Sequence, residues 1–226
     1  MGSLRQAARG LLTACVPKER FFTDARGGPA SGPGARAAIS LTFDDGPHPE
    51  HTPAALAALE RWGQRGTFFV VGREVERFPE LVRRIEDAGH AVGNHSYCHS
   101  EPQATTASVF LADVARADRV LGSVLRAPPR WVRPPKGEVT ALKLCGLWAA
   151  GHSVALWNVD PRDYQMKSIE EASRWSGGYR PEAGDVVLLH DRLPWAAQIV
   201  DDLGKAGVFS RLRSVPLDEW LPAVKS

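Results

Sequence analysis

Cysteine is scarce in this sequence. The 226 residues include three cysteines, an odd number, and no Cys-x-x-Cys pair. A disulfide framework needs cysteines that can all pair, and a thiolate metal cluster needs closely spaced ones, so neither is expected. The pattern favours reduced thiols, as in a cytosolic protein, at Cys15, Cys98 and Cys145.

Long hydrophobic runs are also missing. No apolar run approaches the roughly 18 residues that a membrane-spanning helix needs, so no transmembrane segment is expected. The short apolar stretch from Leu11 to Val16 follows Gly10 and leads directly into the charged run from Lys18 to Arg20. That outline is insufficient for an export signal, and we expect a leading helix and a cytoplasmic protein.

An excess of one charge sign is lacking as well. The sequence has 28 Lys and Arg against 26 Asp and Glu, a formal net charge of +2, with the two signs interspersed. Without a concentrated basic patch, nucleic acid is not an expected partner. The hydrophobic content of 43% is that of an ordinary globular protein with a substantial core. Nothing in the sequence indicates the oligomeric state.

Strand-length apolar runs alternate with helical patterns through residues 37–226. Because strands separated by single helices form parallel sheets, we predict an α/β fold, a single domain built as a distorted (β/α)7-8 barrel of parallel strands. Residues 1–36 are predicted to be an N-terminal basic helix and a Gly/Pro-rich connector. The expected strands are 38–43, 67–71, 91–94, 131–133, 153–158, 186–190 and 213–215. The expected helices are 53–64, 79–88, 106–125, 140–150, 168–175 and 194–206.

Two adjacent carboxylates, Asp44 and Asp45, stand where the strand 38–43 opens into a turn at Gly46 and Pro47. The carboxyl end of a strand is where α/β proteins usually place their chemistry. Neighbouring carboxylates repel each other, and a metal ion that takes one of them would leave the other free to act as a base. The doublet alone is also compatible with a solvated turn.

Two histidines, His95 and His99, follow the expected strand 91–94. At a spacing of four residues, two imidazoles fall on one face of a helical turn and can bind one ion together. Two histidines and one carboxylate leave coordination positions open, which is typical of a catalytic zinc site rather than a structural one. No glutamate lies between the histidines, so a base must come from elsewhere.

The run from Thr42 to Pro47, followed by His95 and His99, resembles the first two motifs of the NodB-type polysaccharide deacetylases, carbohydrate esterase family four. The third motif of that family, Arg-x-Pro-aromatic-Gly, is similar to the run from Arg133 to Gly137. Lys136 stands there in place of the usual aromatic residue, which leaves the shape of the substrate groove open.

The last two motifs of that family can also be matched. The fourth motif ends in Asp-Trp, which Asp163 and Tyr164 resemble, with Asp160 of the same loop as an alternative to Asp163. The fifth, Leu-x-His-Asp, matches the run from Leu188 to Asp191. All five motifs occur in the family's order across residues 40 to 191, each at the end of an expected strand.

The resemblance implies metal-assisted hydrolysis of an N-acetyl or O-acetyl group on a sugar, an oligosaccharide or a glycosylated metabolite. It implies one divalent ion, Zn²⁺ before Co²⁺ or Ni²⁺. The implied metal ligands are Asp45, His95 and His99. The implied catalytic residues are Asp44 as base, Arg133 as its partner, His190 as acid and Asp163 as the residue that orients His190. The implied substrate-binding residues are Lys136 through its backbone N–H, Leu188 and Tyr164 at the acetyl methyl, and Trp195 along the groove.

Three alternatives remain open at this point. A non-haem Fe(II) enzyme uses the same two-histidine, one-carboxylate ligand set. A glycoside hydrolase would use two carboxylates, Asp44 with Asp160 or Asp163, and would not respond to a chelator. A binding module that has lost catalysis is the third. Within the deacetylase interpretation, we expect a small intracellular acetylated substrate rather than a polymer.

Overall fold

The strands of the protein form one parallel sheet that curls into a half-barrel. The computed structural model describes residues 16–25, 37–101 and 104–220. Eight strands are paired in the order β1-β6-β5-β4-β3-β2-β7, and β8 also pairs with β2. The strands are β1 (Phe21–Phe22), β2 (Ala38–Asp44), β3 (Gly66–Val70), β4 (Ala91–Asn94), β5 (Trp131–Val132), β6 (Ser153–Ala155), β7 (Val186–His190) and β8 (Arg213–Ser214).

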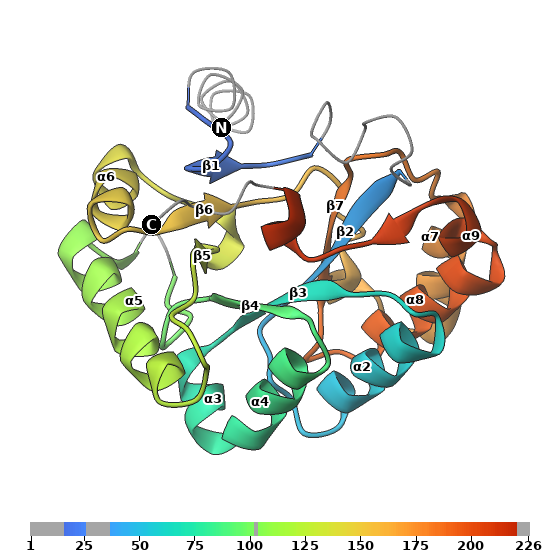
Figure 1. Ribbon diagram of the computed structural model, residues 1–226, viewed down its shortest axis with the longest axis horizontal. Helices are drawn as coiled ribbons and strands as arrows, with labels where there is room; N and C mark the ends of the chain where they lie inside the picture. The colour runs from blue at the N-terminus through green and yellow to red at the C-terminus, as the bar shows by residue number, and fades with distance from the viewer. Residues whose placement is uncertain (1–15, 26–36, 102–103, 221–226) are drawn as a thin grey trace.

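Helices surround the curled sheet in an arc that runs from α6 through α5, α3, α4, α2 and α8 to α7 (Figure 1). Within the described residues, no helix is both long and apolar enough to span a membrane. The helices are α2 (His51–Arg61), α3 (Gly72–Arg77), α4 (Pro79–Asp87), α5 (Ala107–Gly122), α6 (Ala141–Ala149), α7 (Ile169–Gly178), α8 (Trp195–Lys205) and α9 (Val208–Arg211). Three short 3₁₀ turns are η3 (Pro135–Gly137), η4 (Asp163–Gln165) and η5 (Leu217–Trp220).

Strand β2 lies at the centre of the core. All seven of its residues are buried, and it pairs with β3, β7 and β8. Its apolar side chains, including Ile39, Leu41 and Phe43, pack in a cluster with residues of α2 and α8. The alternate residues Ser40 and Thr42 are also buried, and each hydroxyl donates to a backbone carbonyl oxygen, of Val215 and Val187 respectively, as buried polar groups require. Asp44, one of the catalytic candidates, is therefore the last residue of a fully buried strand.

Parallel pairing brings the carboxyl ends of the strands to one edge. Asp44 of β2 is in register with His190 of β7 and with Phe69 of β3, while Asn94 of β4 is in register with Val70 of β3. Residues that lie about 150 positions apart in the sequence therefore meet at this edge, as the predicted α/β fold requires.

The predicted barrel of parallel strands in one domain is confirmed, with strands 91–94 and 186–190 at their expected bounds. Other elements shift by a few residues, and α3 and α9 were not predicted because they are too short to show a helical period. The N-terminal helix and its tail were expected over residues 1 to about 25, of which residues 1–15 lie outside the described residues, as does most of the expected connector, residues 26–36. Further along, Phe21–Phe22 is a strand instead, because both rings are buried where β1 pairs with β6.

Candidate metal centre and active site

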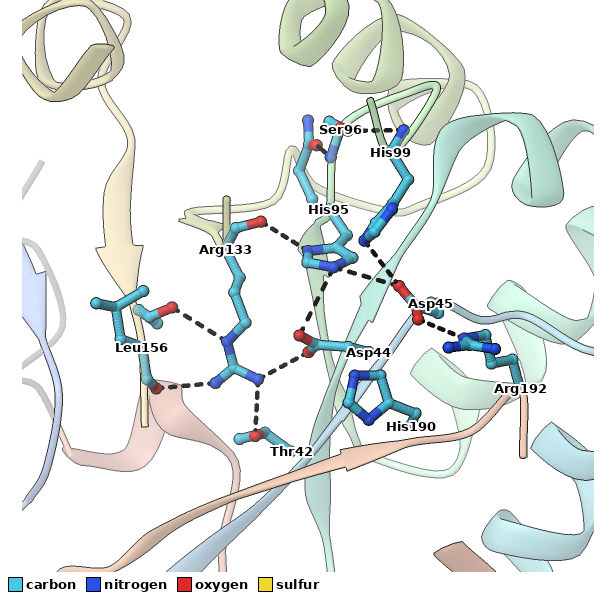
Figure 2. A network of polar contacts seen from close by, with 12 residues as sticks. Thr42, Asp44, Asp45, His95, Ser96, His99, Arg133, Leu156, His190 and Arg192 are labelled. Carbon is cyan, nitrogen blue, oxygen red and sulfur yellow. Dashed lines mark hydrogen bonds and ion pairs between the residues drawn. The ribbon is translucent and has the colours of Figure 1, made fainter. Parts of the chain in front are cut away.

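Three potential metal ligands converge at the carboxyl edge of the sheet (Figure 2). Oδ1 of Asp45 lies 3.4 Å from Nε2 of His95 and 3.2 Å from Nε2 of His99. One ligand atom from each of the three residues lies within 4.8 Å of the other two. Two imidazole nitrogens and one carboxylate oxygen are a donor set that suits a catalytic Zn²⁺ ion. The residues present therefore fit the metal that the sequence implied.

His95 is oriented for this task by its other ring nitrogen. Nδ1 lies 2.7 Å from the backbone carbonyl oxygen of Arg133, to which it can donate, and this leaves Nε2 facing the carboxylates. Metal-binding histidines usually have such a partner, which fixes the tautomer and the ring plane. Burial alone would lower the pKa of His95, but the charges of Asp44 and Asp45 raise it. The two carboxylates therefore favour the protonated form of His95 when no cation is bound.

The two histidines lie on an irregular loop, so the expectation of a helical turn is wrong. Ser96 and His99 have positive φ angles of 66° and 54°. Side chains satisfy the backbone N–H groups instead: Oδ1 of Asn94 accepts from Ser96, Oγ of Ser96 accepts from His99, and Asp113 of α5 accepts from Tyr97. Such local hydrogen bonds compete with helix formation. The resulting loop conformation, rather than a helical turn, directs both imidazoles towards Asp45.

Asp44 is held by a buried arginine. Nη1 of Arg133 donates to Oδ1 of Asp44 at 2.7 Å and to Oγ1 of Thr42 at 2.8 Å. The other donors of the guanidinium reach the carbonyl oxygens of Ala155 (3.1 Å) and Leu156 (2.9 Å). Arg133 is fully buried, and a buried charge is tolerated only when it is paired and hydrogen-bonded in this way. The fixed guanidinium holds Asp44 in place beside the three potential metal ligands.

Asp45 carries a strained backbone and an additional partner that the sequence did not indicate. Its φ angle is 76°, in the left-handed region that non-glycine residues rarely adopt. Burial would raise its pKa, but the hydrogen bond to His95 and the charges of the surrounding histidines lower it well below the usual range. Nε of Arg192 donates to Oδ2 of Asp45 at 2.6 Å. Arg192 directly follows the fifth motif, and no sequence pattern signals the direction of its side chain.

His190 ends β7 and is paired with a buried carboxylate. Its Nδ1 lies 2.6 Å from Oδ1 of Asp163, whose Oδ2 accepts from the backbone N–H of His190 at 2.8 Å. Burial opposes protonation, but the bond and charge of Asp163, aided by Asp44 and Asp45, raise the pKa of His190. Asp160, the alternative partner, is exposed and accepts from the backbone N–H of Arg162. The structure therefore brings Asp163, and not Asp160, to the histidine.

The residues expected to contact substrate differ in exposure. Tyr164 is 46% exposed and its ring stands edge-on to His190 at a centroid distance of 5.6 Å, so it forms a wall beside that histidine. Leu188 is buried within β7, in register with Thr42 of β2. Trp195 is the first residue of α8 and packs partly against the main core. Their contacts with substrate stay predictions.

Lys136 adopts a left-handed conformation, with φ of 57°, in the turn η3 that follows β5. Its ammonium lies 2.7 Å from both carboxylate oxygens of Glu101, just beyond the histidine loop. An exposed ion pair thus stands where the family motif has an aromatic ring. The pair exposes charged groups where an aromatic ring would expose apolar surface.

Asp191 is a second residue whose environment the sequence did not disclose. It is fully buried, Oγ1 of Thr52 donates to its Oδ2, and its Oδ1 has no hydrogen-bond partner among the described residues. Burial raises its pKa to about 7. A Cβ atom at Gly46 would overlap its carboxylate, so the glycine of the Asp-Asp-Gly turn is required for this packing. Asp191 thus supports the turn that presents Asp44 and Asp45.

Comparison with known proteins gives consistent matches. The sequence profile of a family described as polysaccharide deacetylase matches residues 31–155. The chain is 32% identical over 161 residues to a peptidoglycan-N-acetylglucosamine deacetylase of Bacillus cereus, covering 71% of this chain but 58% of that protein. It is 37% identical over 158 residues to a chitooligosaccharide deacetylase of Bradyrhizobium, covering 69% of this chain and 71% of that protein.

Solved structures agree with the sequence matches. The peptidoglycan deacetylase PdaC from Bacillus subtilis aligns with a TM-score of 0.75 and 28% identity, covering 82% of this chain and 90% of that one. A family 4 carbohydrate esterase from Streptomyces lividans, solved in complex with acetate, aligns with a TM-score of 0.71 and 29% identity, covering 79% and 91%.

Proposed function

The chain belongs to the polysaccharide deacetylase family, and from this premise we propose that it is a metal-dependent hydrolase that removes acetyl groups from the nitrogen of an acetylated carbohydrate. The observation that carries the proposal is the convergence of Asp45, His95 and His99 between the Asp44–Arg133 pair and the Asp163–His190 pair. Amide hydrolysis needs a base, an acid and a centre of positive charge, and this edge of the sheet carries candidates for the first two and a set of ligands that could hold the third.

A divalent cation held by the three ligands, for which we propose Zn²⁺, would polarise the acetyl carbonyl and lower the pKa of the attacking water. Asp45 would supply a carboxylate oxygen and the two histidines their Nε2 atoms, and three protein ligands are typical of a catalytic zinc site, which keeps a position for water or substrate. Because His95 is fixed through its Nδ1, the ligand cage is largely formed in advance.

Asp44 is the proposed general base. Its Oδ1 is occupied by the Arg133 guanidinium, while its Oδ2 faces the metal ligands, 3.6 Å from Nε2 of His95. The second oxygen is therefore available to take a proton from the attacking water. The guanidinium keeps the carboxylate in one orientation, so no entropy is lost in orienting it during the reaction.

His190 is the proposed general acid. Asp163 binds its Nδ1 and raises its pKa, which favours the protonated ring, and Nε2 is then the atom that would donate to the departing amine. The base comes from β2 and the acid from β7, so the two proton transfers occur at separate positions around the acetyl group. Because Asp44 accepts one proton and His190 donates another, no single residue has to act as both base and acid.

The remaining contacts concern the oxyanion and the methyl group. We propose that the backbone N–H of Lys136 donates to the oxyanion, a role that does not depend on the side chain. Leu188 and Tyr164 are proposed to contact the acetyl methyl, and Trp195 to line the groove. The Lys136–Glu101 ion pair would then offer polar groups to the hydroxyls of the neighbouring sugar.

An N-acetylglucosamine-containing oligosaccharide is the proposed substrate class. Its support is the activity named for the relatives, which act on chitooligosaccharides and on N-acetylglucosamine of peptidoglycan. Both carry the acetyl group on nitrogen, which favours an amide over an ester as the bond to be cleaved. This choice departs from the small intracellular substrate that the sequence alone suggested, which rested only on absent signals.

The two-carboxylate glycosidase alternative is not favoured. Such an enzyme needs two carboxyl groups that flank the scissile bond. Asp163 is fully buried and both of its oxygens are bonded to His190, and Asp44 is bound to Arg133. Neither arrangement leaves a pair of carboxylates free on opposite sides of a sugar.

Acetate release tests the proposal. Purified protein, stripped with a chelator and dialysed, is incubated with N-acetylated chitooligosaccharides of increasing length, with and without added Zn²⁺. We expect acetate and free amine in equal amounts only in the presence of the metal. Release of reducing sugar ends without acetate, or release that is indifferent to the metal, would refute the proposed function.

A further inference from the structure

Arg192 contacts a residue of the proposed metal site, and no sequence motif predicted this contact. It follows β7 by two positions, and its side chain is 47% exposed. Its guanidinium nevertheless reaches the largely buried carboxylate of Asp45, with Nε 2.6 Å from Oδ2 (Figure 2). Nothing in the mechanism above uses this contact. An exposed ion pair is usually worth little, so its position, rather than its strength, suggests a role.

The two oxygens of Asp45 are divided between two tasks. Oδ1 faces the imidazoles, 3.4 Å from Nε2 of His95 and 3.2 Å from that of His99. Oδ2 points the other way and is taken by Arg192. A carboxylate can bind a metal through one oxygen or through both. The guanidinium therefore selects the one-oxygen mode, which preserves coordination positions for water and substrate.

Asp45 also needs external support. Its φ angle of 76° is one that non-glycine residues hold only when their surroundings impose it. His95 is fixed by a bond to a backbone carbonyl, whereas the Asp45 carboxylate has its fixed partner in Arg192. Partners of this kind around metal ligands commonly change metal affinity by about 10–100-fold when they are removed.

Resting on the proposed function, we propose that Arg192 is a positioning residue for the metal ligand Asp45, holding its Oδ2 so that only Oδ1 binds the cation. The bond joins the loop after β7, which carries the proposed acid, to the end of β2, which carries the metal ligand and the base. Arg192 therefore orders the site before the metal arrives, and its loss lowers metal affinity rather than the stability of the fold.

Metal binding measured without substrate tests this role. The metal-free protein is titrated with Zn²⁺ in competition with a chromophoric chelator, for the wild type and for Arg192→Met, Arg192→Lys and Arg162→Met. Arg162, in the neighbouring loop after β6, is exposed and has no bond to a metal ligand among the described residues, so it is a matched control for the lost charge. Circular dichroism of each variant checks that it is folded.

We expect Arg192→Met to raise the Zn²⁺ dissociation constant by about 10–100-fold. Arg192→Lys, which keeps the charge and one donor, should fall between it and the wild type, and Arg162→Met should stay within about twofold of the wild type. The Co²⁺-loaded protein gives a second readout, since its visible spectrum responds to the number and arrangement of ligands. That spectrum should change in Arg192→Met and not in Arg162→Met.

Two results would overturn the role of Arg192. One is Zn²⁺ binding by Arg192→Met that is as tight as in the wild type, or tighter. The other is an equal loss of affinity in Arg162→Met, which would mean that only the overall charge matters. Wild-type protein that binds Zn²⁺ but releases no acetate would instead refute the deacetylase function and leave the positioning role intact.

Discussion

Strand β2 has polar groups at both of its ends, and the two ends are satisfied in different ways. At the amino end, neutral groups bond only to one another: Oγ of Ser40 donates to the carbonyl of Val215 and accepts from the indole of Trp220, and Oγ of Ser214 accepts from the backbone N–H of Leu41. At the carboxyl end, Asp44 and Asp45 face imidazoles at 3.2 to 3.6 Å.

This difference in hydrogen bonding and charge indicates which end of β2 is suited to bind a ligand. Neutral hydroxyl, amide and indole groups that satisfy one another close the amino end and stabilise the fold. Carboxylates and imidazoles gathered in a buried site are costly unless a cation or protons are shared among them. The carboxyl end therefore gains from binding a cation, and the amino end does not. Each of the following changes tests this contrast.

Loss of a metal ligand should have the largest effect. His99→Ala removes one of the three ligands, so we expect Zn²⁺ binding to fail and acetate release to fall by at least about a thousandfold, since a metal contributes several kcal/mol of transition-state stabilisation. Isothermal titration with Zn²⁺ and an acetate assay measure both. The control is Ser214→Ala at the amino end, which should cost stability but keep Zn²⁺ binding. Near-normal activity in His99→Ala would contradict the assignment.

Replacement of the proposed base should come next. Asp44→Asn keeps the shape of the side chain but cannot accept a proton, so kcat should fall by about 10²–10⁴-fold. Zn²⁺ affinity should change far less, because Asp44 is not among the three ligands. Steady-state kinetics and metal titration separate the two effects. If Zn²⁺ binding is lost in step with kcat, Asp44 is a ligand rather than a base.

Removal of the partner of the proposed acid should have a smaller effect, and one that depends on pH. Asp163 raises the pKa of His190, and an acid must be protonated to act, so activity is lost as pH rises through that pKa. In Asp163→Asn the pKa falls, and the alkaline limb of kcat should move to lower pH, with a loss at neutral pH of no more than about a hundredfold. If the loss of kcat at alkaline pH occurs at the same pH in Asp163→Asn as in the wild type, the titration of His190 is not its cause.

The smallest effect on activity is expected from His90, which lies towards the amino end of the strands. Burial, with the nearby charge of Arg65, lowers its pKa to about 4, and its Nδ1 accepts from the backbone N–H of Gly66. The folded protein thus favours neutral His90, so the stability it contributes is full above about pH 6.5 and is lost as pH falls towards 4, by up to about 3 kcal/mol.

Urea unfolding of the wild type and of His90→Gln between pH 4 and 8 measures this loss. The glutamine can accept the same hydrogen bond but does not titrate in this range, so the difference between the two free energies of unfolding should change with pH. Acetate release at pH 7.5 should be the same in both proteins. A difference that is constant across the range would show that His90 is not responsible.

The fold and most of the site residues could be predicted because their signals are local. Alternating strand and helix patterns imply a parallel sheet, and in such a sheet the residues that end or directly follow a strand are brought to one edge. Asp44 and His190 end a strand, and Asp45, His95 and Arg133 directly follow one. Their roles as ligands, base and acid stay predictions until the experiments above are done.

Other features could not be predicted because they depend on contacts between distant segments. Local patterns allowed either Asp160 or Asp163 to orient His190, and only the path of the loop after β6 brings Asp163 there. The spacing of the histidines suggested a helical turn, but Asn94 and Asp113 bind the backbone of that loop and favour another conformation. The pair Phe21–Phe22 is a strand only because β6 is available to pair with it.

The sequence by itself determined the architecture and the chemical types of the groups at the carboxyl edge, since both follow from periodicity and from residues placed directly after strands. Only the tertiary structure decided which of these groups touch. The contact of Arg192 with Asp45 joins positions 147 residues apart, and the buried Asp191 lies against Gly46. The physical reason is that side-chain direction and burial are set by the packing of the whole chain, which no local pattern encodes.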